Sequence, residues 1–142
     1  MTHPLHPILV HFPIAAWFFA TAGDIASLFL GMQAGWAAGV LLVIGVVTAI
    51  FAMVAGLLEL AKIDQQSDAM KIANQHMMLA MVSWSLYSVS LFLRLDGAAL
   101  VQPSGAAILF SVLGFISLCA TGWYGGRLVF EHGIGVRKKQ SD

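Results

Sequence analysis

Charged side chains are scarce in this sequence of 142 residues: they make up 10 % of it, against about 25 % in soluble domains. Basic and acidic residues balance to a formal net charge of zero, which excludes the basic surface expected of a nucleic-acid-binding protein. Hydrophobic residues make up 59 % of the chain, and the mean hydropathy is +0.86. Because so few charges cannot cover a water-facing surface, we expect an integral membrane protein whose immediate partner is the lipid bilayer.

The sequence is also poor in the features that mark secreted proteins and soluble enzymes. Cys119 is its only cysteine, so no intrachain disulfide can form. No nucleotide-binding loop, catalytic triad or zinc-protease motif occurs. The N-terminus has no basic region, and its apolar stretch is too long for a signal peptide. We therefore expect that stretch to be retained as a membrane helix.

Four apolar stretches approach the length of about 20 residues that a bilayer-spanning helix needs. They predict spans at about 8–30, 36–60, 74–95 and 105–131. Residues 31–35 link the first pair, and a polar segment links the second span to the third, where Ser67 or Asp68 is a candidate helix cap. The expected fold is all-α: one integral membrane four-helix bundle over residues 1–142.

The basic residues predict the orientation of this bundle. With four spans, both termini and the polar segment 61–75 lie on one side of the membrane. That side holds six of the seven basic residues, and only Arg94 lies on the other. By the positive-inside rule we expect the N- and C-termini in the cytoplasm and the protein in a bacterial inner membrane.

All five histidines fall on the same predicted side, and each lies near the end of a span. They are His3, His6, His11, His76 and His132, and Glu59 ends the second span at a similar depth. Imidazoles are common metal ligands and proton carriers. Charged residues collect at both ends of membrane spans, but histidine has no general preference for one side. The pattern therefore favours a shared site, with contacts to backbone and lipid headgroups as the structural alternative.

A polar stripe follows the third span at the spacing of one helix face. It consists of His76, Ala80, Ser83, Tyr87, Ser90 and Arg94. Its length is about 27 Å at the rise of an α-helix, nearly the full bilayer core. Lipid cannot satisfy hydroxyl groups, so the stripe is expected to face inward. It serves either as interhelical hydrogen bonding or as a path for protons or water.

Small residues and prolines add two further expectations. The second span carries Gly45, Ala49, Ala52 and Gly56 on one face, and the fourth carries several glycines. Such faces allow close helix packing, a homodimer, or space for a flat cofactor. Pro13 lies inside the first span and predicts a bend near His11. That bend either aims His11 toward the bundle or only shapes the entry of the chain.

Two motifs, "HPILVHFPI" (6–14) and "GWYGGRLVFEHGIGV" (122–136), resemble signatures of the domain of unknown function 2231 family. Its members are small bacterial membrane proteins of about four predicted helices, and the resemblance covers nearly the whole chain. It implies that the family pattern includes His6, His11, Gly125, Gly126, His132 and Gly133. It also implies a redox context, because some relatives occur beside or fused to cytochrome-like modules. The reaction stays open.

The leading hypothesis is a b-type haem protein. His76 and either His11 or His132 would be the axial ligands, and Gly125 would leave room for the macrocycle. One haem near one face cannot carry electrons across a core of about 30 Å. We therefore expect lateral electron transfer to a quinone or a redox partner.

Two alternatives remain open. A Zn, Fe or Cu ion suits a mixed imidazole and carboxylate ligand set. The candidate ligands are His3, His6, His11, Glu59, His76 and His132. The other alternative is a structural or assembly subunit without a cofactor.

Overall fold

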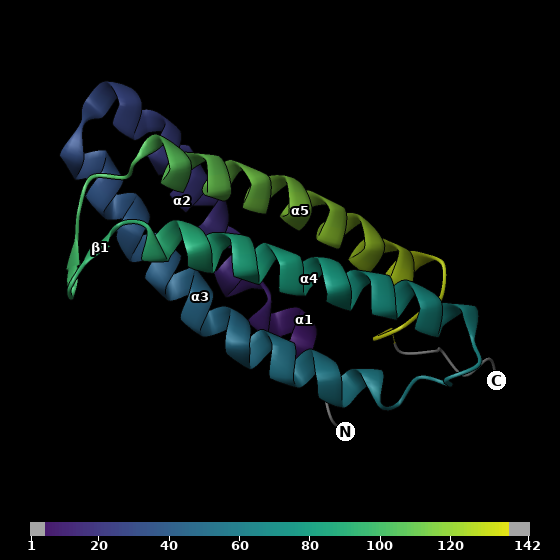
Figure 1. Cartoon of the computed structure of the whole chain (residues 1–142). Helices are drawn as coiled ribbons and strands as arrows, with labels where there is room; N and C mark the ends of the chain where they lie inside the picture. Colours follow the sequence, from purple (N-terminus) through teal and green to yellow (C-terminus); the bar gives the residue numbers. More distant parts are fainter. Residues whose placement is uncertain (1–4, 137–142) are drawn as a thin grey trace.

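The computed structural model describes residues 5–136 and is shown in Figure 1. The described chain is helical apart from one short β-hairpin, in agreement with the all-α prediction. The helices are α1 (His6–Leu9), α2 (His11–Leu30), α3 (Met32–Leu60), α4 (Asp68–Phe92) and α5 (Gly105–Phe130). Strands β1 (Leu95–Asp96) and β2 (Ala99–Leu100) pair antiparallel between α4 and α5.

The four long helices form two antiparallel hairpins. Helix α2 packs along α3, and α4 packs along α5; the hairpins then meet through α2 against α5 and α3 against α4. Figure 1 shows the β1–β2 ribbon at one end of the bundle and the α3–α4 loop at the other. We call these the hairpin end (residues 94–104) and the loop end (residues 61–67). Short α1 packs beside α3.

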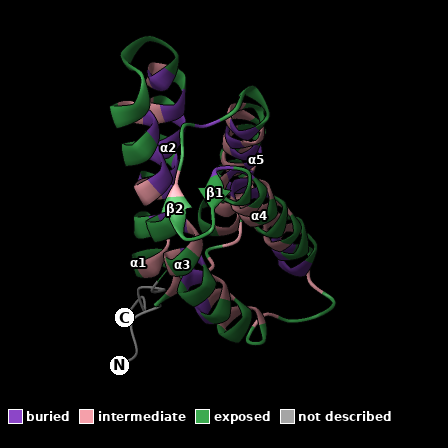
Figure 2. Ribbon diagram, turned by 60° about the vertical axis from the view of Figure 1, so that its left-hand side comes forward, coloured by how far each residue is buried: buried purple, intermediate pink, exposed green. Residues whose placement is uncertain are grey.

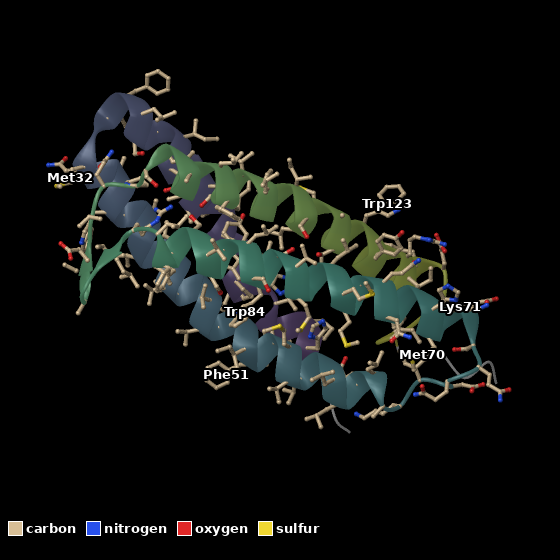
Figure 3. The ribbon with its side chains drawn as sticks, in the orientation of Figure 1. Met32, Phe51, Met70, Lys71, Trp84 and Trp123 are labelled. Carbon is tan, nitrogen blue, oxygen red and sulfur yellow. The ribbon has the colours of Figure 1, made fainter. Side chains whose placement is uncertain are left out.

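The bundle is apolar outside and is packed with small and polar residues inside. Figure 3 shows Phe51 of α3 and Trp123 of α5 pointing away from the bundle, and they are 62 % and 73 % exposed. Figure 2 shows the same exposure along the outer faces of the helices. Lipid, and not water, suits such a surface.

Three helices are long and apolar enough to cross a membrane: His6–Leu30 (α1 with α2), Met32–Leu60 and Gly105–Phe130. Helix α4 has 25 residues but a more polar sequence, because one of its faces carries the predicted polar stripe. The fourth span, 74–95, therefore stays a prediction. The bundle with three long apolar helices makes the chain a candidate multi-pass membrane protein.

The turn between α2 and α3 is tighter than predicted. Gly31 alone reverses the chain, with φ 74° and ψ −154°, a conformation that glycine adopts without a Cβ clash. Helix α3 therefore begins at Met32, and the expected link over residues 31–35 was wrong.

The start of α4 agrees with the prediction. Ser67 Oγ accepts a hydrogen bond from the backbone N–H of Met70 at 3.2 Å, which confirms the cap. One turn on, Lys71 Nζ donates to Asp68 Oδ1 at 2.8 Å, and this hydrogen bond with the lysine charge lowers the pKa of Asp68. Helix α4 thus begins about 9 Å before the predicted span, as expected of a capped extension.

The first predicted span is interrupted. The helix is divided at Val10, between α1 and α2 and three residues before Pro13, although Val10 keeps helical dihedral angles, φ −64° and ψ −21°. Proline has no backbone N–H, and its ring disfavours an unbroken helix over the preceding turn. Both α1 and α2 contact α3, and α2 also contacts α5.

Candidate functional site

Two imidazoles, one from each pair of antiparallel helices, lie close together near the loop end of the bundle. The ring centroids of His6, on α1, and His76, on α4, are 6.1 Å apart, and the ring planes are perpendicular. Both residues are half-buried. The sequence predicted a histidine cluster at this level, and the structure brings together this one pair.

Backbone carbonyls hold both rings. Nδ1 of His6 lies 2.8 Å from the carbonyl oxygen of Ala52 on α3, and Nδ1 of His76 lies 2.9 Å from that of Thr121 on α5. A carbonyl oxygen only accepts, so Nδ1 carries the proton and donates in each ring. In the neutral rings Nε2 then keeps an unshared electron pair. This is the tautomer in which a metal-ligating histidine is usually held.

Glycines provide the space for the two rings. A Cβ at Gly56 would lie 3.0 Å from the Cε1 and Nδ1 atoms of His6, and a Cβ at Gly125 would lie 3.2 Å from Cε1 of His76. Both distances are shorter than ordinary van der Waals contact. Gly125, which the sequence assigned to the cofactor site, therefore lies directly against the predicted ligand His76.

Glu59 joins the pair through the main chain. Its Oε1 accepts a hydrogen bond from the backbone N–H of His6 at 3.2 Å. The first N–H groups of a helix have no partner within the helix, so the carboxylate anchors the start of α1 to the end of α3. This contact brings an acidic group of the predicted set beside the imidazole pair.

The remaining predicted ligands lie elsewhere. His11 is exposed, and its Nδ1 lies 3.3 Å from the carbonyl oxygen of Ile8, three residues earlier in the chain. His132 follows α5 in the turn that ends at Gly133, and His3 lies outside the described residues. His6, and not His11, therefore lies beside His76, since five residues along a helix turn the two side chains about 140° apart. Across residues 5–136 no three His, Cys, Asp or Glu residues are placed to hold one metal ion.

A second polar site lies in the half of the bundle nearer the hairpin end. Arg94 Nη1 and Nη2 donate to Asp24 Oδ1 and Oδ2 at 2.6 and 2.9 Å, and both side chains are 0 % exposed. Arg94 Nε and Nη2 also donate to the carbonyl and hydroxyl of Ser90 at 3.2 and 2.9 Å. Ser111 Oγ donates to Asp24 Oδ2 at 2.5 Å. The ion pair therefore joins α2 to the end of α4 and to α5.

The family model described as "Predicted membrane protein (DUF2231)" matches residues 2–138. The chain belongs to this family. The match confirms the resemblance that the two terminal motifs carry. No curated protein and no solved structure matches the chain.

Sequence reasoning found the inner face of α4 in this DUF2231 protein but missed its main partner. Ser83, Ser90 and Arg94 are each 0 % exposed, which confirms that the stripe faces inward. From the sequence, Asp24 was expected either to be functional or to reach headgroup water; in the structure it is 0 % exposed. A signal was present: Arg94 is the only basic residue predicted on that side, and Asp24 is the only acid in the first span.

Proposed function

We propose that this DUF2231 protein is a membrane electron-transfer protein that holds one b-type haem between His6 and His76. The observation that carries the proposal is the pair of imidazoles, which come from two hairpins and whose Nδ1 atoms are both fixed by carbonyl groups. His6 and His76 would hold the haem iron, and the bound group would supply one-electron redox chemistry.

The spacing of the rings supports two ligands on opposite sides of one metal. Bonds from histidine nitrogen to a metal are about 2 Å long, so two coaxial imidazoles have ring centres about 6 Å apart. The centroids of His6 and His76 are 6.1 Å apart.

The direction of electron transfer follows from the position of the pair near one end. The sequence predicts all five histidines on the loop-end side, so we expect no second centre of this type to relay electrons across the core. A partner must therefore approach from the side. An apolar groove between α4 and α5 is the place where we propose that a quinone approaches; it is lined by Gln75, Met78, Leu79, Val82 and Tyr124.

We assign the loop end to the cytoplasmic side of a bacterial inner membrane. Lys62 and Lys71 are exposed there, and Arg127 lies in the last turn of α5. Arg94, which the sequence assigns to the other side, is neutralised by Asp24 inside the bundle. The positive-inside rule then favours a cytoplasmic loop end.

Absorption spectra of the purified protein in detergent test the proposal. The wild-type protein is expected to show a Soret band and one haem per chain, and His6→Ala and His76→Ala are each expected to lose it. His11→Ala is the matched control and should keep the band, because His11 is exposed and contacts only Ile8. Retention of the band in His76→Ala contradicts the proposed ligand pair.

A non-haem metal ion held by the imidazoles of His6 and His76 is the second candidate. Imidazole ligands suit Zn or Fe. Elemental analysis of the same samples separates the two: a stoichiometric metal without a Soret band supports the ion. If neither haem nor metal is bound, a structural or assembly role replaces both. The homodimer stays a prediction.

A further inference from the structure

Two exposed tryptophans lie near opposite ends of the bundle. Trp36 lies in the second turn of α3, toward the hairpin end, and Trp123 lies two turns before the end of α5, toward the loop end. Figure 3 shows Trp123 pointing away from the helices. Tryptophan is enriched at both interfaces between membrane and water, because its ring is apolar and its indole N–H needs a polar partner. The two residues therefore mark two candidate levels for the ends of the bilayer core.

The contacts of His76 place Trp123 at the level of the imidazole pair. His76 Nδ1 donates to the Thr121 carbonyl, and a Cβ at Gly125 would lie 3.2 Å from the His76 ring. His76 therefore lies against the turn 121–125 of α5, and Trp123 is the middle residue of that turn. We call the level of His76 and Trp123 the loop-end level.

The second level lies about one bilayer core away. On α3 the turn 52–56 holds His6, whose ring lies beside that of His76. From Trp36 to the middle of this turn, 36 to 54, the helix rises over 18 residues, or about 27 Å. On α4, from 76 to 94, His76 is likewise 18 residues from Arg94. Both distances are close to the hydrocarbon thickness of about 30 Å, and we call the level of Trp36 and Arg94 the hairpin-end level.

The outer surface between the two levels suits hydrocarbon. The exposed side chains of α3 from residue 37 to residue 54 are all apolar. Thr48 Oγ1 donates to the Ile44 carbonyl at 2.7 Å, and Ser85 Oγ donates to the Met81 carbonyl at 2.9 Å. These two hydroxyls are not buried, and each is satisfied by its own helix. Lipid offers a hydroxyl no partner, so a lipid-facing serine or threonine needs such an internal bond.

Exposed polar side chains begin just outside the two levels. Lys71 and Gln75 of α4 lie beyond the loop-end level, and Gln33 of α3 and Asp96 of β1 lie beyond the hairpin-end level. Among residues 5–136, His11 is the one exposed basic, acidic or imidazole side chain between the levels, about 8 Å inside the loop-end level. Its Nδ1 lies 3.3 Å from a carbonyl oxygen of the preceding turn. The polarity of the surface thus changes at the levels that the tryptophans mark.

We propose that the hydrocarbon core of the bilayer covers the bundle only between Trp36 and Trp123, so that the His6–His76 pair lies at the headgroup level of the loop end. Hydropathy alone predicts a longer span, because all of α3, Met32–Leu60, is apolar enough for the core. Its 29 residues are about 43 Å long, which exceeds the core by about 13 Å. On the proposed boundaries the last turn of α3 and the first two turns of α4 lie outside the core. The imidazole pair is then reached from the headgroup region, and this inference does not depend on haem.

The test is the depth of spin labels along the outer face of α3 in phosphatidylcholine liposomes. Single cysteines are introduced and labelled in a Cys119→Ala background. Electron paramagnetic resonance then measures the collisions of each label with oxygen, which concentrates in lipid, and with a water-soluble nickel chelate. Met32→Cys and Leu58→Cys lie about 6 Å outside the two levels, and Val47→Cys lies near the middle. We expect several-fold more collisions with the chelate at positions 32 and 58 than at position 47, and the reverse order for oxygen.

Phe51→Cys is the matched control, because Phe51 and Leu58 are 62 % and 66 % exposed but Phe51 lies inside the loop-end level. Its label should be as protected from the chelate as the label at Val47. All labelled positions are exposed, so the core stays intact, and circular dichroism verifies this for each variant. A Leu58→Cys label as protected as that of Val47→Cys overturns the proposal, because the core then extends past the imidazole pair. A Phe51→Cys label as accessible as that of Leu58→Cys also overturns it, because the core then ends deeper in the bundle.

Discussion

Replacing Asp24 by asparagine is expected to destabilise the bundle more than any other single change of charge. The two direct contacts from Arg94 are 2.6 and 2.9 Å long, and both side chains are fully buried. Asp24→Asn leaves the guanidinium buried without a counter-charge. Removing one partner of a buried ion pair costs about 3–5 kcal/mol. At about 2–4 °C per kcal/mol for a chain of this size, the melting temperature in detergent should fall by about 10 °C.

The measurement is thermal unfolding of matched variants followed by circular dichroism. Asp96→Asn is the control, because this substitution removes the same charge at an exposed position in β1. The double variant Asp24→Leu with Arg94→Met should recover much of the loss, since it leaves no unpaired charge. Equal melting temperatures for Asp24→Asn and Asp96→Asn would refute the reasoning that the pair is buried and unscreened.

Three further substitutions test the packing of α3, the N-terminal cap of α4 and the space beside the His76 imidazole. Gly45→Ala places a Cβ 2.4 Å from Trp17 Nε1 and is expected to cost about 1–3 kcal/mol, with a shift in tryptophan fluorescence. Ser67→Ala removes the cap of α4 and should cost about 1 kcal/mol in the same unfolding assay. Gly125→Val places a Cβ 3.2 Å from the ring of His76 and should lower the haem content in the absorption assay. Gly122→Val, where a Cβ would meet nothing within 4 Å, is the control and should leave the haem content unchanged.

Helical periodicity predicts much of this architecture because a bilayer restricts the chain to helices with one satisfied polar face. The inward stripe of α4 and the Ser67 cap follow from local spacing alone, and both are confirmed. The turn at Gly31 was missed because the sequence gives no sign that one residue is enough to reverse the chain. The β1–β2 hairpin was also missed, since two-residue strands have no periodicity to detect.

The sequence predicted a cluster of histidines, but it did not predict which histidine lies beside His76. Within residues 5–136, the ring beside His76 belongs to His6 and not to His11. Five residues along a helix turn the two side chains about 140° apart, and the packing of α1 on α3 brings His6 inward. Such tertiary contacts are not encoded in the spacing of one span. The Asp24–Arg94 pair likewise joins residues from separate hairpins.

Electron paramagnetic resonance of the oxidised, purified protein tests the central claim most directly. Two axial imidazoles whose planes are 90° apart, as in the His6–His76 pair, should give a strongly anisotropic low-spin ferric signal. The signal should vanish in both His6→Ala and His76→Ala and persist in His11→Ala. A high-spin ferric signal, no ferric signal at all, or a low-spin signal that survives loss of His6 would contradict the proposed ligation.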